Sequence, residues 1–257
     1  MYIYIMKNHF FYSYFGNKRE EVETIYKNIN LDNIDTIIEP FCGSCAFSFY
    51  ISTLHPNKYK YVINDNDKNL TELLKITQDK IKFDEFVQEL EEVLKDIDKD
   101  KYLSIIKSGS LLGYVLMNYI YCIRPGLFPI NKLKSIKGFI SAPIINFLRT
   151  EDITILNNDA IDVVKNYMNI ETSLIFLDPP YVMLNNDHYS SAKLNIYEFL
   201  YENTIDNFKS TIVLVLELNW IIKLLLGKHI KFTYDKKYQT THKQTTHCII
   251  SNKTTDN

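Results

Sequence analysis

The sequence has few cysteines and no long apolar run, the features that are typical of secreted disulfide-rich domains and of membrane proteins. Its 257 residues include four cysteines, whose number and spacing do not suggest the disulfide framework of a small secreted domain. Cys42 and Cys45 form a C-x-x-C pair, but no second Cys or His pair lies nearby, so we expect no metal site and no redox chemistry there. No apolar run is long enough for a signal sequence or a membrane span. We therefore expect an intracellular, soluble protein.

The chain also lacks an excess of charge of either sign. It has 29 Lys and Arg residues against 31 Asp and Glu residues, a net charge of −2. A nucleic-acid partner would therefore need local basic patches instead of a general positive field. Hydrophobic residues make up 46% of the chain, which is enough for a core, and the length allows one large α/β domain with a smaller insertion.

The most informative stretch is S-L-I-F-L-D-P-P-Y at residues 173–181. Its apolar run is typical of a buried strand of a parallel sheet. Ligands of open α/β sheets bind beyond the carboxyl ends of the strands, so we expect Asp178 and Tyr181 to face a pocket. Pro179 and Pro180 have no N–H, which leaves the carbonyls before them available to a ligand. The alternative interpretation is a strand that ends in an ordinary Pro-Pro turn.

A strand, turn and helix are predicted earlier in the chain. Residues 36–38 favour a strand, E-P-F-C-G-S-C-A follows at 39–46, and helical periodicity continues to residue 54. Gly43 lets the backbone approach a ligand, and the helix that follows offers its positive end. Neither G-x-G-x-x-G nor a P-loop is present, so a cofactor without phosphates fits this turn better.

Two further predicted strands end at acidic residues. The strand at 59–63 leads to Asp65 and Asp67, where a carboxylate is placed to accept from the two hydroxyls of a ribose. Capping of the next helix explains the same residues equally well. The strand at 153–156 leads to Asp159. Later strands are predicted at 211–216, 230–234 and 247–250, with a helix at 197–208.

The alternation of strand and helix lapses at about residues 79–150, which indicates an inserted subdomain. Its segments 83–98 and 102–123 have helical spacing. A loop at 124–137 combines Pro and Gly with a local cluster of basic residues. A solvated loop is one interpretation, and a loop that lies on a phosphate backbone and reaches base edges is the other.

In chain order, these segments resemble those of the Dam-like, adenine-specific DNA N6-methyltransferases, which use S-adenosylmethionine. Y-F-G-N-K at 14–18 looks like the family's W-A-G-G-K-type motif, and E-P-F-C-G-S at 39–44 looks like its E-P-F-x-G-S loop. D-N-D at 65–67 is similar to its D-x-N ribose site, and D-P-P-Y at 178–181 matches its D-P-P-Y. T-H-C-I-I-S-N at 246–252 is like its closing strand.

The resemblance implies a Rossmann-like methyltransferase sheet, mostly parallel with an antiparallel closing strand. Residues 1–78 and 151–257 would form the catalytic domain, and 79–150 a mainly helical target-recognition subdomain. The implied cofactor is S-adenosylmethionine, the implied partner is double-stranded DNA, and no metal is expected. We expect a monomer, with a dimer as the alternative.

The candidate site residues fall into three groups. The catalytic group is Asp178, Pro179, Pro180 and Tyr181. The cofactor-binding group is Tyr14, Gly16, Lys18, Glu39, Phe41, Gly43, Asp65, Asp159 and Asp178. The DNA-binding group is Arg124, Asn131, Lys132 and Lys134. The resemblance further implies that Lys18 meets the methionine carboxylate, Asp65 the ribose and Asp159 the adenine of the cofactor.

Three departures from the family's pattern are present, the mildest being Tyr14 and Asn17 in place of Trp and Gly, which retains an aromatic residue and the lysine. Cys45 stands where the family usually has a small Gly, which predicts a tighter cofactor loop. The segment P-G-L-F-P-I-N at 125–131 resembles an N-G-L-F-R-V-N loop but has Pro129 in place of the arginine. The departures at Cys45 and Pro129 motivate a second hypothesis, a methyltransferase-like subunit that binds nucleic acid without catalysis. Methylation of an RNA adenine is a third.

Overall fold

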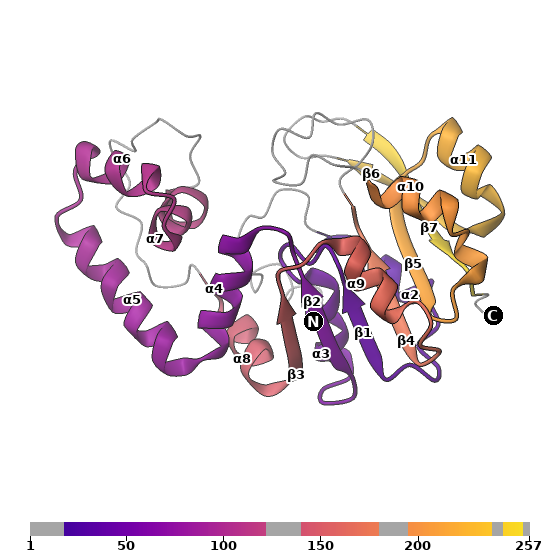
Figure 1. Cartoon of the computed structure of the whole chain (residues 1–257), viewed down its shortest axis with the longest axis horizontal. Coiled ribbons are helices and arrows are strands. Elements are labelled where there is room, and N and C mark those ends of the chain that lie inside the picture. The colour runs from indigo at the N-terminus through magenta and orange to yellow at the C-terminus, as the bar shows by residue number, and fades with distance from the viewer. Residues whose placement is uncertain (1–17, 122–139, 180–194, 238–243, 254–257) are drawn as a thin grey trace. The chain divides into compact units, whose positions relative to one another are not determined.

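The computed structural model describes residues 18–121, 140–179, 195–237 and 244–253 (Figure 1). The chain divides into two compact units. The sheet unit comprises Glu20–Asp67 and Glu151–Asn257, and the helical unit comprises Met1–Arg19 and Lys68–Thr150. The functional boundaries expected at residues 79 and 150 stay a prediction.

The described residues of the sheet unit form one seven-stranded sheet in the order β3-β2-β1-β4-β5-β7-β6. Strands β1 to β5 run parallel to one another, and β7 runs antiparallel to both β5 and β6. The predicted Rossmann-like methyltransferase sheet is therefore confirmed. We call the edge at which the five parallel strands end the carboxyl edge. The strands are β1 (Thr36–Glu39), β2 (Lys60–Asn64), β3 (Asp152–Leu156), β4 (Ser173–Leu177), β5 (Thr211–Glu217), β6 (Ile230–Lys237) and β7 (Gln244–Ser251).

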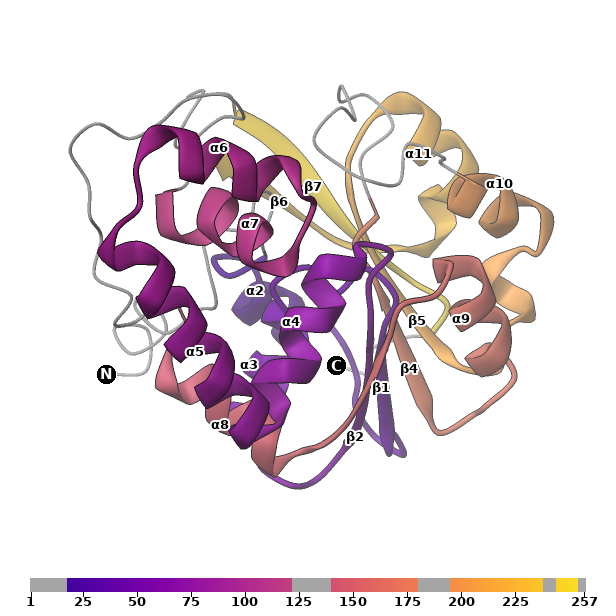
Figure 2. The ribbon, with the colours of Figure 1, turned by 60° about the vertical axis from the view of Figure 1, so that its left-hand side comes forward.

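Helices cover both faces of this sheet (Figure 2). On one face lie α2 (Val22–Lys27) and α3 (Ala46–Leu54). On the other lie α9 (Ala160–Tyr167), α10 (Asn195–Glu202) and α11 (Trp220–Leu226), the last of which the sequence did not predict. The predicted helix at 197–208 is shorter than expected, because α10 ends at Glu202 and only a 3-10 turn, Ile205–Asn207, follows.

The central strand β4 shows why an unbroken apolar run is needed here. All five of its residues are buried. Successive side chains of a strand point to opposite faces, so a strand between two helical layers has no polar side. Phe176 stacks on Phe47 of α3 with ring centroids 4.0 Å apart. Ile175 and Leu177 join the core on the other face, together with Val163 of α9.

Buried polar contacts attach α2 to the last two strands of the sheet. Glu21, just before α2, is buried and accepts from the hydroxyl of Tyr234 at 2.7 Å. Its carboxylate also pairs with Lys236 and lies 3.2 Å from Nδ1 of the buried His247. An ion pair and hydrogen bonds therefore connect the start of α2 to the hairpin formed by β6 and β7.

The described part of the helical unit contains α4 (Lys68–Gln78), α5 (Lys80–Lys95), α6 (Lys99–Lys107), α7 (Leu111–Val115), a π-helix (Leu116–Tyr121) and α8 (Ala142–Thr150). Side-chain caps explain where several of these helices begin. Asp79 accepts from two N–H groups of the first turn of α5, and Asp98 accepts from the N–H of Lys101 in α6. Arg149 ties α8 to α4 through a 3.0 Å bond from Nε to the carbonyl of Thr77. Helix α8 was not predicted from the sequence.

The helical spacing at 102–123 is interrupted in the structure. Gly109 has φ +67°, in the left-handed region, and ends the helical stretch that contains α6. Ser110 then accepts from the N–H of Gly113 and begins α7. The helical spacing expected at 102–123 is present but does not reveal this break, because the apolar period of 3.6 continues across a turn that glycine and serine make possible.

Gly113 provides a test of the packing between α6 and α7. A Cβ at this position would lie 2.5 Å from the carbonyl oxygen of Ile105. Gly113→Ala should therefore lower the free energy of unfolding by roughly 1–3 kcal/mol, although alanine is normally the better helix former. Gly227→Ala is the control, because its nearest neighbour would lie 3.9 Å away. Equal stability of the two variants in urea denaturation would contradict this account.

Candidate cofactor and catalytic site

Glu39 ends β1 and is buried beneath the turn that follows. Its Oε2 accepts from the hydroxyl of Ser48 at 2.6 Å and from the N–H of Ser48 at 3.2 Å. Ser48 lies in the first turn of α3, where N–H groups have no helical partner. Burial, with a smaller contribution from the charge of Asp178, raises the pKa of Glu39 to about 8 in spite of the hydrogen bonds from Ser48, which lower it. Glu39 and Asp178 are thus close enough to influence each other.

The turn after β1 contains two residues in the left-handed region. Gly43 has φ +45°, and Cys45 has φ +55° directly before α3. The N–H of Cys45 donates to the carbonyl of Cys42 at 2.6 Å, which closes the turn. A side chain at such a φ costs roughly 1–2 kcal/mol, whereas glycine adopts it freely. This explains why a glycine suits the position at which Cys45 departs from the family's pattern.

Asp65 follows β2 and joins two loops. Its Oδ2 accepts from the N–H of Gly43 at 3.0 Å, and its Oδ1 accepts from the N–H of Asp67 at 3.0 Å. Burial raises the pKa of Asp65 to about 6. Each carboxylate oxygen has two acceptor positions, so one bond to each oxygen does not exhaust the capacity of the group.

Asp159 and Phe41 have local roles in the structure. Asp159 is exposed, and its Oδ1 caps α9 by accepting from the N–H of Ile161 at 2.8 Å. Phe41 is partly buried and packs against the hydrophobic core. These contacts neither require nor prevent the cofactor contacts expected of these residues, which stay predictions.

Asp178 follows β4 and is half-buried, and Pro179 after it is buried. The other two members of the catalytic group, Pro180 and Tyr181, lie outside the described residues, as do Tyr14 and Gly16 of the cofactor-binding group. The same holds for all four members of the DNA-binding group, Arg124, Asn131, Lys132 and Lys134. Lys18 is buried and belongs to the helical unit.

Four adjacent strands therefore lead to a carboxylate at the carboxyl edge. In sheet order they are β3 with Asp159, β2 with Asp65, β1 with Glu39 and β4 with Asp178. An acidic edge of this kind disfavours phosphates and suits a cationic ligand with hydroxyl groups, although the buried Glu39, with its pKa of about 8, adds little negative charge at neutral pH. S-adenosylmethionine fits this set of side chains, because it has a sulfonium cation and a ribose diol and no phosphate.

Asn64 is a residue at this edge that the sequence analysis did not assign to the site. It is the last residue of β2, has no exposed surface and bonds to the loops after β1 and β3. The only sequence signal was a polar residue at the end of an apolar strand.

The described residues were also searched for a metal site and for a membrane-spanning helix. They contain no group of three or more His, Cys, Asp or Glu side chains arranged to hold a metal ion. None of the helices in the same residues combines the length and apolar character that a membrane crossing requires.

The order and directions of the strands define an α/β protein with the open, mostly parallel sheet of the Rossmann-like methyltransferases. The family model of the D12 class N6 adenine-specific DNA methyltransferases matches residues 14–117. This match confirms the resemblance to the Dam-like family, and three of the five motifs quoted for that resemblance fall within it. The family match is evidence that the chain is an adenine-specific DNA N6-methyltransferase. No curated protein matches the chain.

The left-handed backbone at Cys45 predicts a difference in stability between two variants. Cys45→Gly and Cys45→Ala both remove the thiol, but only glycine relieves the left-handed backbone. The glycine variant should therefore exceed the alanine variant in free energy of unfolding by roughly 1 kcal/mol. Chemical denaturation measures this difference. An alanine variant at least as stable as the glycine variant would show that the turn adopts another conformation.

The raised pKa of Glu39 predicts how the stability of the folded protein depends on pH. Between its ordinary pKa of 4.5 and its folded pKa of about 8, the folded protein keeps a proton that the unfolded chain releases. The free energy of unfolding therefore falls as pH rises through this window, by at most about 1.4 kcal/mol per pH unit. Glu39→Gln cannot ionise and should lose this fall, so its stability relative to the unsubstituted protein should increase from pH 5 to pH 8. Denaturation curves of the two proteins with the same pH dependence would rule out a protonated Glu39.

Proposed function

We propose that the chain transfers a methyl group from S-adenosylmethionine to the N6 amine of an adenine that is flipped out of duplex DNA. The observation that supports this most directly is the position of Asp178 at the carboxyl edge, beside the turn that the family match includes. A base within a duplex does not expose its amine to such a site, so extrusion of the base is required.

The amine of adenine is a poor nucleophile because its lone pair is delocalised into the ring. In the proposal, Asp178 and the carbonyl of Pro179 accept hydrogen bonds from this amine, so that its lone pair turns toward the methyl donor. S-adenosylmethionine, when bound, would supply an electrophilic methyl group as its S–CH3 bond breaks, and the methylated amine would then release one proton to solvent. Tyr181 stacks on the extruded base and replaces its lost neighbours, a contact that contributes roughly 1–3 kcal/mol.

The cofactor-binding group holds the rest of the donor in this proposal. Asp65 accepts from the ribose hydroxyls, Asp159 meets the adenine moiety, and Lys18 meets the methionine carboxylate. Tyr14 adds cation–π attraction to the sulfonium. The remaining acceptor positions on Asp65 support its role, because the two bonds described leave room for a diol.

Double-stranded DNA is the proposed substrate, and residues 79–150 are the proposed target-recognition subdomain. Within it, Arg124, Lys132 and Lys134 would contact phosphates, and Asn131 would reach base edges. The net charge of −2 makes such a local cluster necessary.

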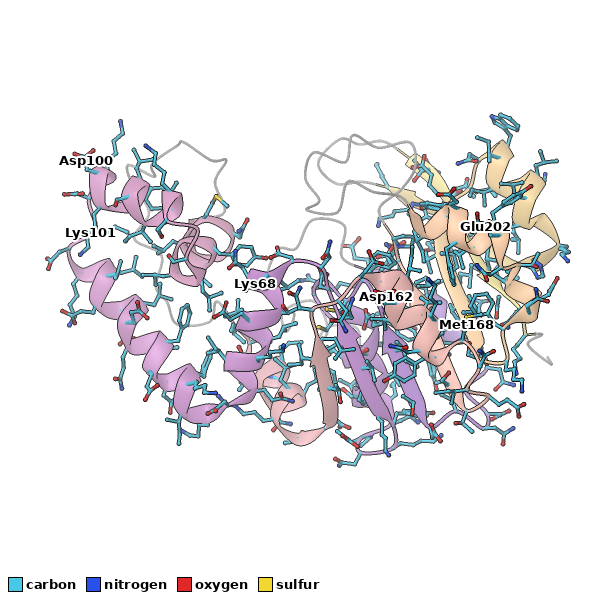
Figure 3. All side chains as sticks on the ribbon, in the orientation of Figure 1. Lys68, Asp100, Lys101, Asp162, Met168 and Glu202 are labelled. Atoms are coloured by element: carbon cyan, nitrogen blue, oxygen red, sulfur yellow. The ribbon has the colours of Figure 1, made fainter. Side chains whose placement is uncertain are left out.

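The test is transfer of labelled methyl from S-adenosylmethionine to unmodified duplex DNA, followed by digestion to nucleosides. We expect label in N6-methyladenine, and a loss of roughly 100-fold or more in Asp178→Ala, because the amine loses its acceptor. Asp162→Ala is the matched control, since this carboxylate lies exposed on α9 (Figure 3).

Other outcomes would contradict the proposal in distinct ways. Label on RNA but not on DNA would change the substrate. Binding of the cofactor without methyl transfer to DNA or RNA would show that the substrate is not a nucleic acid. DNA binding without any cofactor binding would establish the non-catalytic subunit instead.

A further inference from the structure

Asn64 connects three loops at the carboxyl edge through one buried side chain. Its Nδ2 donates to the carbonyl of Pro40 at 2.9 Å and to the carbonyl of Asn158 at 3.1 Å. Its Oδ1 accepts from the N–H of Asn158 at 2.9 Å. Asn64 itself ends β2, so these bonds join the loops after β1, β2 and β3.

Neighbouring bonds tie the same loops together. The N–H of Cys42 donates to the main-chain oxygen of Asn64 at 2.8 Å. Nδ2 of Asn157 donates to the main-chain oxygen of Asp65 at 2.8 Å, and the N–H of Gly43 donates to the Asp65 carboxylate. The turn after β1 and the two acidic loops are therefore fixed relative to one another.

The chemistry of an amide suits this position and that of a carboxylate does not. Both N–H groups of the Asn64 side chain point to carbonyl oxygens. An aspartate of the same shape would place an oxygen against those two oxygens, inside a site with no exposed surface. Leaving buried acceptors unpaired is costly, so the loops would move apart instead.

We propose that Asn64 is a positioning residue for the nucleoside half of the cofactor. It sets the distance between Asp65 and Asp159, which lie on the loops proposed to hold the ribose and the adenine. This inference rests on the proposed function, because it names the part of that site on which Asn64 acts.

The chain contains a matched control at the opposite edge of the sheet. Asn252 donates through Nδ2 to the carbonyls of Phe208 at 3.2 Å and Ser210 at 2.9 Å. Its Oδ1 accepts from the N–H of Ile212 at 2.9 Å, near the amino end of β5. Asn252→Asp therefore breaks the same kinds of bond away from the carboxyl edge.

The experiment measures binding of S-adenosylhomocysteine and of 5′-methylthioadenosine by calorimetry. The second ligand keeps the nucleoside but lacks the amino-acid part. Asn64→Asp should weaken both ligands to a similar degree, by roughly tenfold or more, the factor that corresponds to about 1.4 kcal/mol. Asn252→Asp should bind both as the unsubstituted protein does.

A kinetic readout separates positioning from loss of folded protein. In Asn64→Asp, KM for S-adenosylmethionine should rise while kcat at saturation and the affinity for DNA stay unchanged. Should Asn64→Asp fail to fold, Asn157→Ala takes its place, because Asn157 is exposed and gives up one bond to Asp65. We expect a smaller loss for both ligands, roughly threefold.

Two results would overturn the inference while the proposed function stands. One is unchanged binding of 5′-methylthioadenosine in Asn64→Asp, or in Asn157→Ala where that variant replaces it. The other is an equal loss in Asn252→Asp, which would make the effect one of general stability. If the unsubstituted protein binds neither ligand, the proposed function fails and this inference fails with it.

Discussion

The parallel alignment of strands β1 to β5 is the constraint on which the rest of the structure depends. Parallel neighbours end at the same edge of a sheet, however far apart they lie in the sequence. Glu39, Asp65, Asp159 and Asp178 are separated by long stretches of chain, yet each stands at the end of one of four adjacent strands. No local motif brings these four residues together. A different order of the strands in the sheet would separate them along the carboxyl edge.

Gathering carboxylates at one edge has an electrostatic cost that ligands can offset. Burial raises the pKa values of Glu39 and Asp65, so each group gains a proton more readily than it would in water. A bound cation favours the ionised forms. In the proposed site, protons and a positively charged cofactor would therefore compete for the same edge, and the affinity for the cofactor would depend on pH.

The sequence was sufficient for the fold class and for the strands that approach the site. Asp178 and Gly43 could be placed because an apolar run before a carboxylate, and a glycine turn before a helix, each have a local physical reason. The hydrogen bonds of Asn64 could not be predicted, since its partners are main-chain groups of residues distant in the sequence. Helix α8 was missed in a similar way, because Arg149 finds its acceptor in another helix.

Strand β7 follows every other strand in the sequence but lies between β5 and β6 in the sheet. Its residues Ile249 and Ile250 have no exposed surface. During synthesis, the hydrogen-bonding edge of β5 thus stays open until β7 emerges from the ribosome. Such an edge can pair with other chains, so the nascent protein is open to misassociation at β5 until β7 is available.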